Sequence, residues 1–134
     1  MKQASYTDAF YMYKNLITKE YEKHKIILES NKILQSEKEI FRNIMEQKAD
    51  QNVYLNSIRT LSDVLAKYYE KNVIILIDEY DVPLENAYHE GFYDDMTNLI
   101  RSCFESALKT NPSLEFAVLT GCPVSYTHLR AHET

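Results

Sequence analysis

The stretch Val73-Ile-Ile-Leu-Ile77, followed at once by Asp78-Glu79-Tyr80-Asp81, decides the fold of this chain. Five consecutive apolar residues, most of them β-branched, are typical of a parallel-sheet strand that is buried on both faces. Pro83 lacks the backbone N–H that a central strand donates, so the strand should not continue through it. We therefore expect a short buried strand over residues 73–77 that ends in a group of carboxylates.

A helix and a second apolar strand follow in the sequence. Apolar residues recur at helical spacing from Phe92 to Ala107, and residues 114–120 (LEFAVLT) form a second strand-like run that Gly121 ends. Strand, helix and strand in this order make a βαβ unit, whose two strands are parallel. The expected fold class is α/β, with this βαβ unit preceded by a helical segment.

The residues before the first strand have the spacing of amphipathic helices. We expect one helix over residues 7–29, a second opened by a capping box between Ser36 and Glu39, and a third capped by Asp50. The tyrosines of these helices should pack between helices. His24 lies on the apolar stripe of the first helix, where we expect a half-buried, hydrogen-bonded side chain and not a catalyst.

Polar side chains follow both expected strands. Because parallel strands point the same way, Asp78 and Glu79 should emerge at the same edge as Thr120, the edge where open α/β sheets bind ligands. Two carboxylates behind an apolar strand match the Walker B pattern of nucleotide hydrolases. There the first holds Mg²⁺ on the phosphates, usually through water, and the second orients or deprotonates the attacking water. The Thr120 hydroxyl could then sense the terminal phosphate by hydrogen bonding.

A simpler interpretation of the same residues stays open at this point. Carboxylates often follow buried strands because the chain returns to water there, and such residues then have no chemical role. The apolar run and the pair Asp78-Glu79 do not by themselves decide between the two interpretations.

Composition excludes several classes of function. Gly91 and Gly121 are the 2 glycines of the chain, so it carries neither a glycine-rich phosphate loop nor a three-glycine dinucleotide fingerprint. The net charge of −5 argues against direct nucleic-acid binding. The sequence has no apolar run long enough for a membrane span and no signal peptide, so we expect a cytoplasmic protein without a membrane partner. Cys103 and Cys122 have no metal-binding spacing, and Cys103 should be a buried thiol.

The end of the chain resembles a sequencing artefact. Residues 124–134 (VSYTHLRAHET) look like one translated reading frame of a sequencing adaptor, so we expect a non-native tail and leave it out of the fold. His128 and His132 are spaced as two zinc ligands on a helix would be, but no Glu follows the first His and no third ligand is evident. We expect no metal site there.

The residues around both strands resemble a known family. Residues 73–96 (VIILIDEYDVPLENAYHEGFYDDM) and 104–122 (FESALKTNPSLEFAVLTGC) resemble the bacterial AAA-ATPase-like family, whose members are often fused to a nuclease-like domain of the PD-(D/E)XK type. The resemblance implies a partial P-loop NTPase-like parallel sheet, with ATP and Mg²⁺ bound in the complete protein. It implies Asp78 as the magnesium ligand, Glu79 as a catalytic and nucleotide-binding carboxylate, and Thr120 as a catalytic polar group on the sensor strand.

The resemblance also implies domain boundaries. In that family the phosphate loop lies upstream, so residues 1–123 would be the central part of an ATPase domain that is inactive in isolation. This part would consist of a helical region over 1–71 and a Walker B βαβ unit over 72–122, followed by the tail at 124–134. The implied partners are a nucleotide and, in the full-length protein, a nuclease-like domain and further copies of the chain.

Two other functions remain as alternatives from the sequence. The first is a helical protein-interaction module without enzymatic activity, in which residues 78–81 (DEYD) form a surface loop. The second is a metal-dependent nuclease that uses the acidic residues directly. That chemistry needs a nearby catalytic Lys on the same sheet, and neither expected strand contains one.

Overall fold

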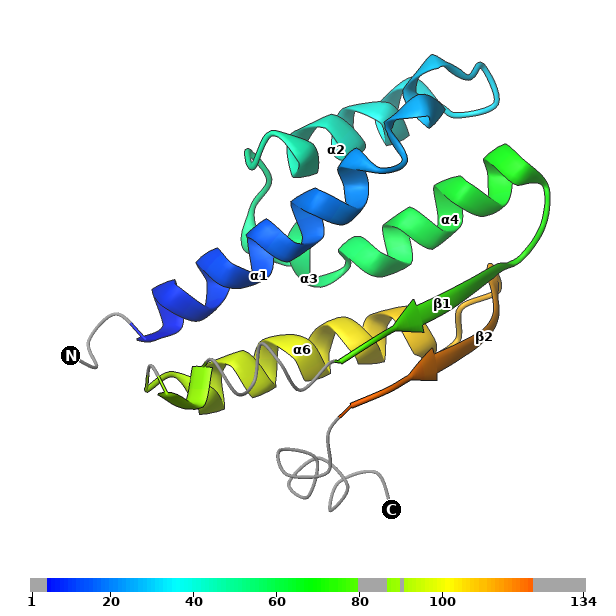
Figure 1. The fold of residues 1–134 in the computed structure, drawn as a ribbon. Coiled ribbons are helices and arrows are strands. Elements are labelled where there is room, and N and C mark those ends of the chain that lie inside the picture. The colour runs from blue at the N-terminus through cyan, green and yellow to red at the C-terminus, as the bar shows by residue number, and fades with distance from the viewer. Residues whose placement is uncertain (1–4, 80–86, 90, 122–134) are drawn as a thin grey trace.

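The computed structural model describes residues 5–79, 87–89 and 91–121, and the expected tail at 124–134 and Asp81 lie outside these ranges (Figure 1). The helices and strands are α1 (Ser5–Glu22), the 3-10 helix η1 (Lys25–Glu29), α2 (Gln35–Met45), α3 (Gln51–Leu55), α4 (Ser57–Tyr69), β1 (Val73–Ile77), α6 (Tyr93–Leu108) and β2 (Leu114–Leu119). The described part is therefore mixed and mostly helical. None of its helices has the length and apolarity needed to cross a membrane.

The two strands form the predicted parallel pair. β1 lies beside β2 in a two-stranded sheet, and α6 connects the end of one strand to the start of the other. β1 covers the apolar run that predicted it. The α/β expectation is thus confirmed as a βαβ unit preceded by helices.

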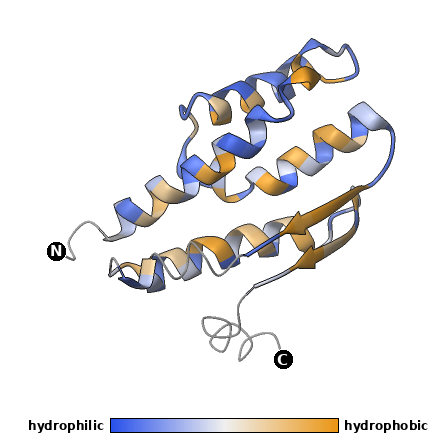
Figure 2. Cartoon of the chain, viewed as in Figure 1, coloured by the Kyte–Doolittle hydropathy of each residue, from blue (hydrophilic) through white to orange (hydrophobic). Residues whose placement is uncertain are grey.

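The helices that the structure describes cover one face of the sheet and leave the other open. Ile77 and Leu119 on the covered face pack against the hydrophobic core. Residues of the other face alternate with them and are exposed, with Leu76 72% exposed, and both strands are among the most hydrophobic parts of the chain (Figure 2). We call this the open sheet face, made of Ile74, Leu76, Phe116 and Val118. The prediction of a strand buried on both faces is wrong, because the described helices all lie on one side.

Buried tyrosines join the helices, as the sequence predicts. Tyr13 donates its hydroxyl hydrogen bond to the backbone oxygen of Tyr54 (2.7 Å). Tyr54 in turn donates to the oxygen of Ile44 (2.8 Å), and Tyr21 donates to the oxygen of Ser57 (2.5 Å). Burial raises the pKa of Tyr13 and of Tyr21 above the ordinary tyrosine value. Each of these hydroxyls therefore bonds a backbone carbonyl of a different helix and ties the two helices together.

The helix boundaries differ from the sequence prediction in two places. The first helix ends at Glu22 and continues after a turn as η1, not as one helix to residue 29. The second begins after Leu34, whose backbone N–H donates to the carboxylate of Glu37 (3.0 Å), so the predicted Ser36–Glu39 capping box is wrong. The Glu37 carboxylate also accepts from Lys67 of α4, and this tertiary contact favours the cap.

The third predicted helix is capped as expected but divided. Asp50 accepts a hydrogen bond from the backbone N–H of Val53 (3.1 Å), which confirms the predicted N-cap. The helix then breaks at Asn56 into α3 and α4. The Asn56 side chain donates to the backbone oxygen of Asn52 and accepts from Ser106 of α6, so contacts within and outside the helix hold the break.

Candidate functional site

The candidate site lies where β1 and β2 end. Both strands end at the same edge, since Ile77 pairs with Leu119 and the backbone N–H of Thr120 donates to the oxygen of Ile77 (2.9 Å). Asp78 and Glu79 follow β1 directly. The structure therefore brings together the three residues that the sequence places at the carboxyl edge.

The Thr120 side chain links the other two residues. Its hydroxyl donates a hydrogen bond to Oδ1 of Asp78. The hydroxyl oxygen of Thr120 also accepts a hydrogen bond from the backbone N–H of Glu79, over 3.2 Å. All three residues are exposed, so a ligand could reach them from solvent.

The backbone of Glu79 has an uncommon conformation. Its φ angle is 54°, which lies in the left-handed region that non-glycine residues seldom adopt. Such conformations cost free energy and persist when surrounding contacts hold them. The hydrogen bond from its N–H to Thr120 is one such contact.

An irregularity in the strand pairing sets which residues meet at this edge. Val73 pairs with Leu114 but Ile74 pairs with Phe116, so Glu115 is an extra residue on β2. From there the strands run in step, which brings Thr120 beside Asp78. If the register of Val73 and Leu114 continued along the strands, Glu115 would pair with Ile74 and Thr120 would lie beside Glu79 instead. The bulge is therefore part of how the site is built.

The site offers a partial set of ligands for a divalent cation. Carboxylate and hydroxyl oxygens are hard ligands of the kind that Mg²⁺ prefers, and protein-bound Mg²⁺ often uses one or two carboxylates together with water and phosphate oxygens. Within the described residues, no group of three or more Asp, Glu, His and Cys side chains could hold a metal. Asp78 thus fits Mg²⁺ as one of a few protein ligands, and the described residues do not form a complete cage.

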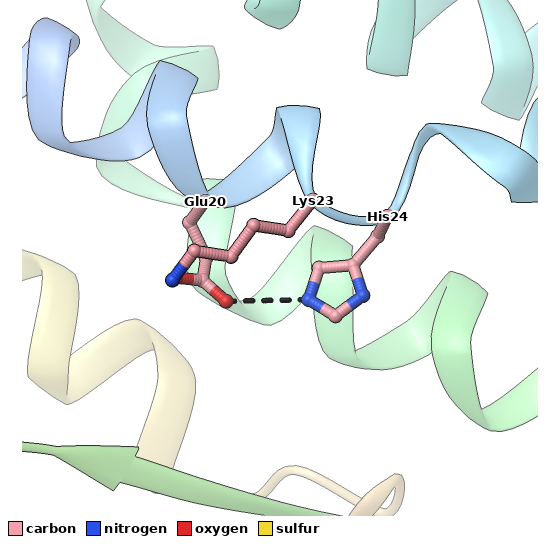
Figure 3. A network of polar contacts seen from close by, with 3 residues as sticks. All are labelled: Glu20, Lys23 and His24. Atoms are coloured by element: carbon pink, nitrogen blue, oxygen red, sulfur yellow. Dashed lines mark hydrogen bonds and ion pairs between the residues drawn. The ribbon is translucent and has the colours of Figure 1, made fainter.

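His24 belongs to a different cluster, far from this edge. Its Nε2 lies 3.2 Å from Oε2 of Glu20, and Lys23 donates to the other oxygen of that carboxylate (3.1 Å; Figure 3). Partial burial raises the pKa of Glu20, but the hydrogen bonds from Lys23 and His24 outweigh it and lower the pKa. The cluster lies at the C-terminal end of α1, whereas the strands point toward the opposite end of that helix (Figure 1). His24 is half-buried and paired, as predicted.

Cys103 is an inert thiol inside the helical core. Its side chain is 2% exposed, and burial raises its pKa to about 11. A thiol with a raised pKa is a poor nucleophile because the thiolate is the reactive form. This agrees with the prediction of a buried reduced cysteine and gives it no role at the sheet edge.

Sequence reasoning missed the polar contacts that hold the start of β2. Arg59 of α4 donates to the backbone oxygen of Thr110 (2.9 Å), and also lies within hydrogen-bond distance of the oxygens of Ser106 and Lys109. Asn111 donates to the Ser62 hydroxyl (3.1 Å). These contacts fix the α6–β2 connection against α4, and so fix where β2 begins. A helical Arg and a loop Asn carry no sequence signal for such a pairing.

Comparison with known proteins gives a family. The model of the AAA-ATPase-like family, described as predicted AAA-ATPases, matches residues 2–129. The chain belongs to the AAA-ATPase-like family. Membership implies an ATPase-like protein and, for the family in general, the use of a nucleotide with Mg²⁺.

The match covers both parts of this AAA-ATPase-like chain. It includes the helices as well as the βαβ unit, and it runs into the 124–134 segment as far as residue 129. No curated protein and no solved structure matches the chain. The roles of individual residues in this AAA-ATPase-like protein therefore depend on the geometry of the sheet edge.

Proposed function

We propose that the carboxyl edge of β1 and β2 is the part of an ATP-hydrolysing site that binds the Mg²⁺ ion and the attacking water, with β1 as its Walker B strand. The observation that carries the proposal is the contact between Asp78 and Thr120, which gathers two carboxylates and a hydroxyl at the ends of two parallel strands. Ligands of open α/β sheets bind at this edge. Family membership supports the same kind of activity.

Each carboxylate has its own role in this proposal. Asp78 is the ligand on the magnesium side, where Mg²⁺ neutralises charge on the phosphates. Glu79 accepts a proton from the attacking water or orients it, which a carboxylate can do and an amide cannot. Both groups are exposed at the edge, so neither is part of the core and both are accessible to a nucleotide.

The phosphate-binding loop is a separate part of the proposed site. The only glycines of these 134 residues are Gly91 and Gly121, which lie too far apart to form a glycine-rich loop. We propose that a segment outside residues 1–123 supplies this loop and that residues 1–123 are the central part of the ATPase domain. Since most of the phosphate affinity comes from the backbone N–H groups and the Lys of that loop, this chain alone should bind ATP weakly.

The test separates binding from hydrolysis. In a family member that carries the phosphate loop, substitutions equivalent to Glu79→Gln and Asp78→Asn are compared with Glu115→Gln, an exposed carboxylate near the other end of β2. We expect Glu79→Gln to lower ATP turnover at least about 100-fold while nucleotide affinity persists. Asp78→Asn should weaken Mg²⁺-dependent binding as well, and Glu115→Gln should change neither. Normal turnover in Glu79→Gln would refute the proposal.

A further inference from the structure

We propose that Thr120 is a positioning residue: its hydroxyl holds the Asp78 carboxylate and the Glu79 peptide in place, and it is not the group that contacts the terminal phosphate. This assignment replaces the phosphate-sensing role expected from the sequence. It rests on the proposed function, since it concerns the same site.

The Thr120 hydroxyl can donate one hydrogen bond at a time. A threonine hydroxyl has one proton to donate, and here that proton goes to Oδ1 of Asp78. One of its lone pairs accepts the N–H of Glu79. To donate to a phosphate, the hydroxyl would have to turn its proton away from Asp78. Thr120 can therefore hold Asp78 or donate to a phosphate, but not both at once.

Thr120 also holds the backbone of Glu79. The left-handed φ angle of 54° turns the chain immediately after β1, and a non-glycine residue needs outside contacts to stay there. Thr120, the residue directly after β2, makes two contacts here: it donates its N–H to the oxygen of Ile77 and accepts the N–H of Glu79 with its hydroxyl. A single residue after β2 thus fixes the direction of the chain at the proposed catalytic carboxylate.

The first experiment measures this contact in the present chain. Amide hydrogen exchange of Glu79 is followed by NMR in the wild type, Thr120→Val and Thr120→Ser. Valine keeps the shape of threonine without its hydroxyl, so we expect Glu79 to exchange about fivefold faster or more. Thr120→Ser restores the hydroxyl and should restore slow exchange. The amide of Val73, which donates to Ser113 at the other end of the sheet, should not change in any variant.

A matched control comes from α6. The hydroxyl of Thr97 is buried and has no hydrogen-bond partner among the residues that the structure describes, so Thr97→Val removes a hydroxyl without breaking a described contact. It should leave Glu79 exchange as in the wild type. Unchanged Glu79 exchange in Thr120→Val, or equal changes in both valine variants, would overturn the proposal.

The second experiment separates positioning from phosphate contact. In a family member with the phosphate loop, the Thr120→Val equivalent should lower kcat while the ratio of ATP to ADP affinity stays within about twofold, because no contact to the terminal phosphate is lost. The Thr120→Ser equivalent should recover most of kcat. A fall of about tenfold in that ratio would assign Thr120 to the phosphate and refute positioning. Normal turnover in Glu79→Gln would refute the ATPase site instead, whereas the exchange result in the present chain would still stand.

Discussion

The helical interior buries its polar groups, whereas the carboxyl edge of the sheet leaves them exposed. In the interior, the hydroxyls of Tyr13, Tyr21 and Tyr54 donate hydrogen bonds to backbone carbonyls and are shielded from water. At the edge, Asp78 and Glu79 are exposed, and their partner Thr120 is exposed as well. Polar groups in the first region stabilise the fold, whereas those in the second stay accessible for a ligand.

This difference teaches where stability and chemistry are located in the chain. The large buried side chains gather in the helices, while the two strands are only half covered. The edge residues are therefore open to substitution without loss of the fold. Mutations in the two regions should therefore change the free energy of unfolding by different amounts.

The largest effect is expected from Phe41→Ala in the interior. Phe41 is 0% exposed, and its ring centroid lies 4.6 Å from that of Tyr21. Truncation leaves a cavity and should lower the free energy of unfolding by about 3–5 kcal/mol in urea titrations. Asp78→Asn, the matched change at the edge, should alter it by less than about 0.5 kcal/mol. Equal losses of unfolding free energy in the two variants would show that the interior and the edge contribute alike to stability.

A medium effect is expected from alkaline pH through Cys103. Burial raises the pKa of this thiol from 9.0 to about 11, so the folded state holds its proton more tightly than the unfolded state. The stabilisation is complete below pH 9 and is lost as the pH rises from there through the folded pKa. Between pH 8 and 11 the wild type should lose on the order of 2 kcal/mol more than Cys103→Ala. Parallel stability curves for the two proteins would contradict this.

The smallest effect is expected between the two regions, at Arg59. This side chain donates to carbonyls at the α6–β2 connection, where it is partly open to solvent. Arg59→Ala should lower the free energy of unfolding by about 1 kcal/mol, measured against Arg42→Ala, an exposed arginine on α2 that should cost less than about 0.5 kcal/mol. A loss of unfolding free energy as large as that of Phe41→Ala would contradict this and would show that the α6–β2 connection belongs energetically to the helical interior.

The sequence predicts the parts of this molecule that depend on local pattern. The apolar run at 73–77 predicts β1, and the order of strand, helix and strand predicts the parallel pairing. Parallel pairing alone then predicts that Asp78 and Thr120 share an edge, which the structure confirms.

The features that the sequence does not predict all depend on contacts between distant elements. Glu37 caps α2 while Lys67 of α4 pairs with the same carboxylate, and Asn56 breaks a helix while it bonds to α6. The open sheet face was missed because a fully apolar strand has the same sequence whether one or both faces are covered. The left-handed Glu79 was missed because no local signal marks a glutamate for that conformation.

The extra residue in β2 has a consequence for how this chain can change over evolution. Because residues 116–119 pair one to one with residues 74–77, Thr120 meets Asp78 only if the number of residues between 116 and 120 is kept. Loss of a single codon within 116–119 would place Thr120 beside Ile77 and turn the residues after the deletion to the opposite face of β2. Loss of the codon for Glu115 would instead remove the irregularity and leave Thr120 beside Asp78. Related genes should therefore vary in the exposed residue at 115, including its deletion, yet show no insertions or deletions between 116 and 120.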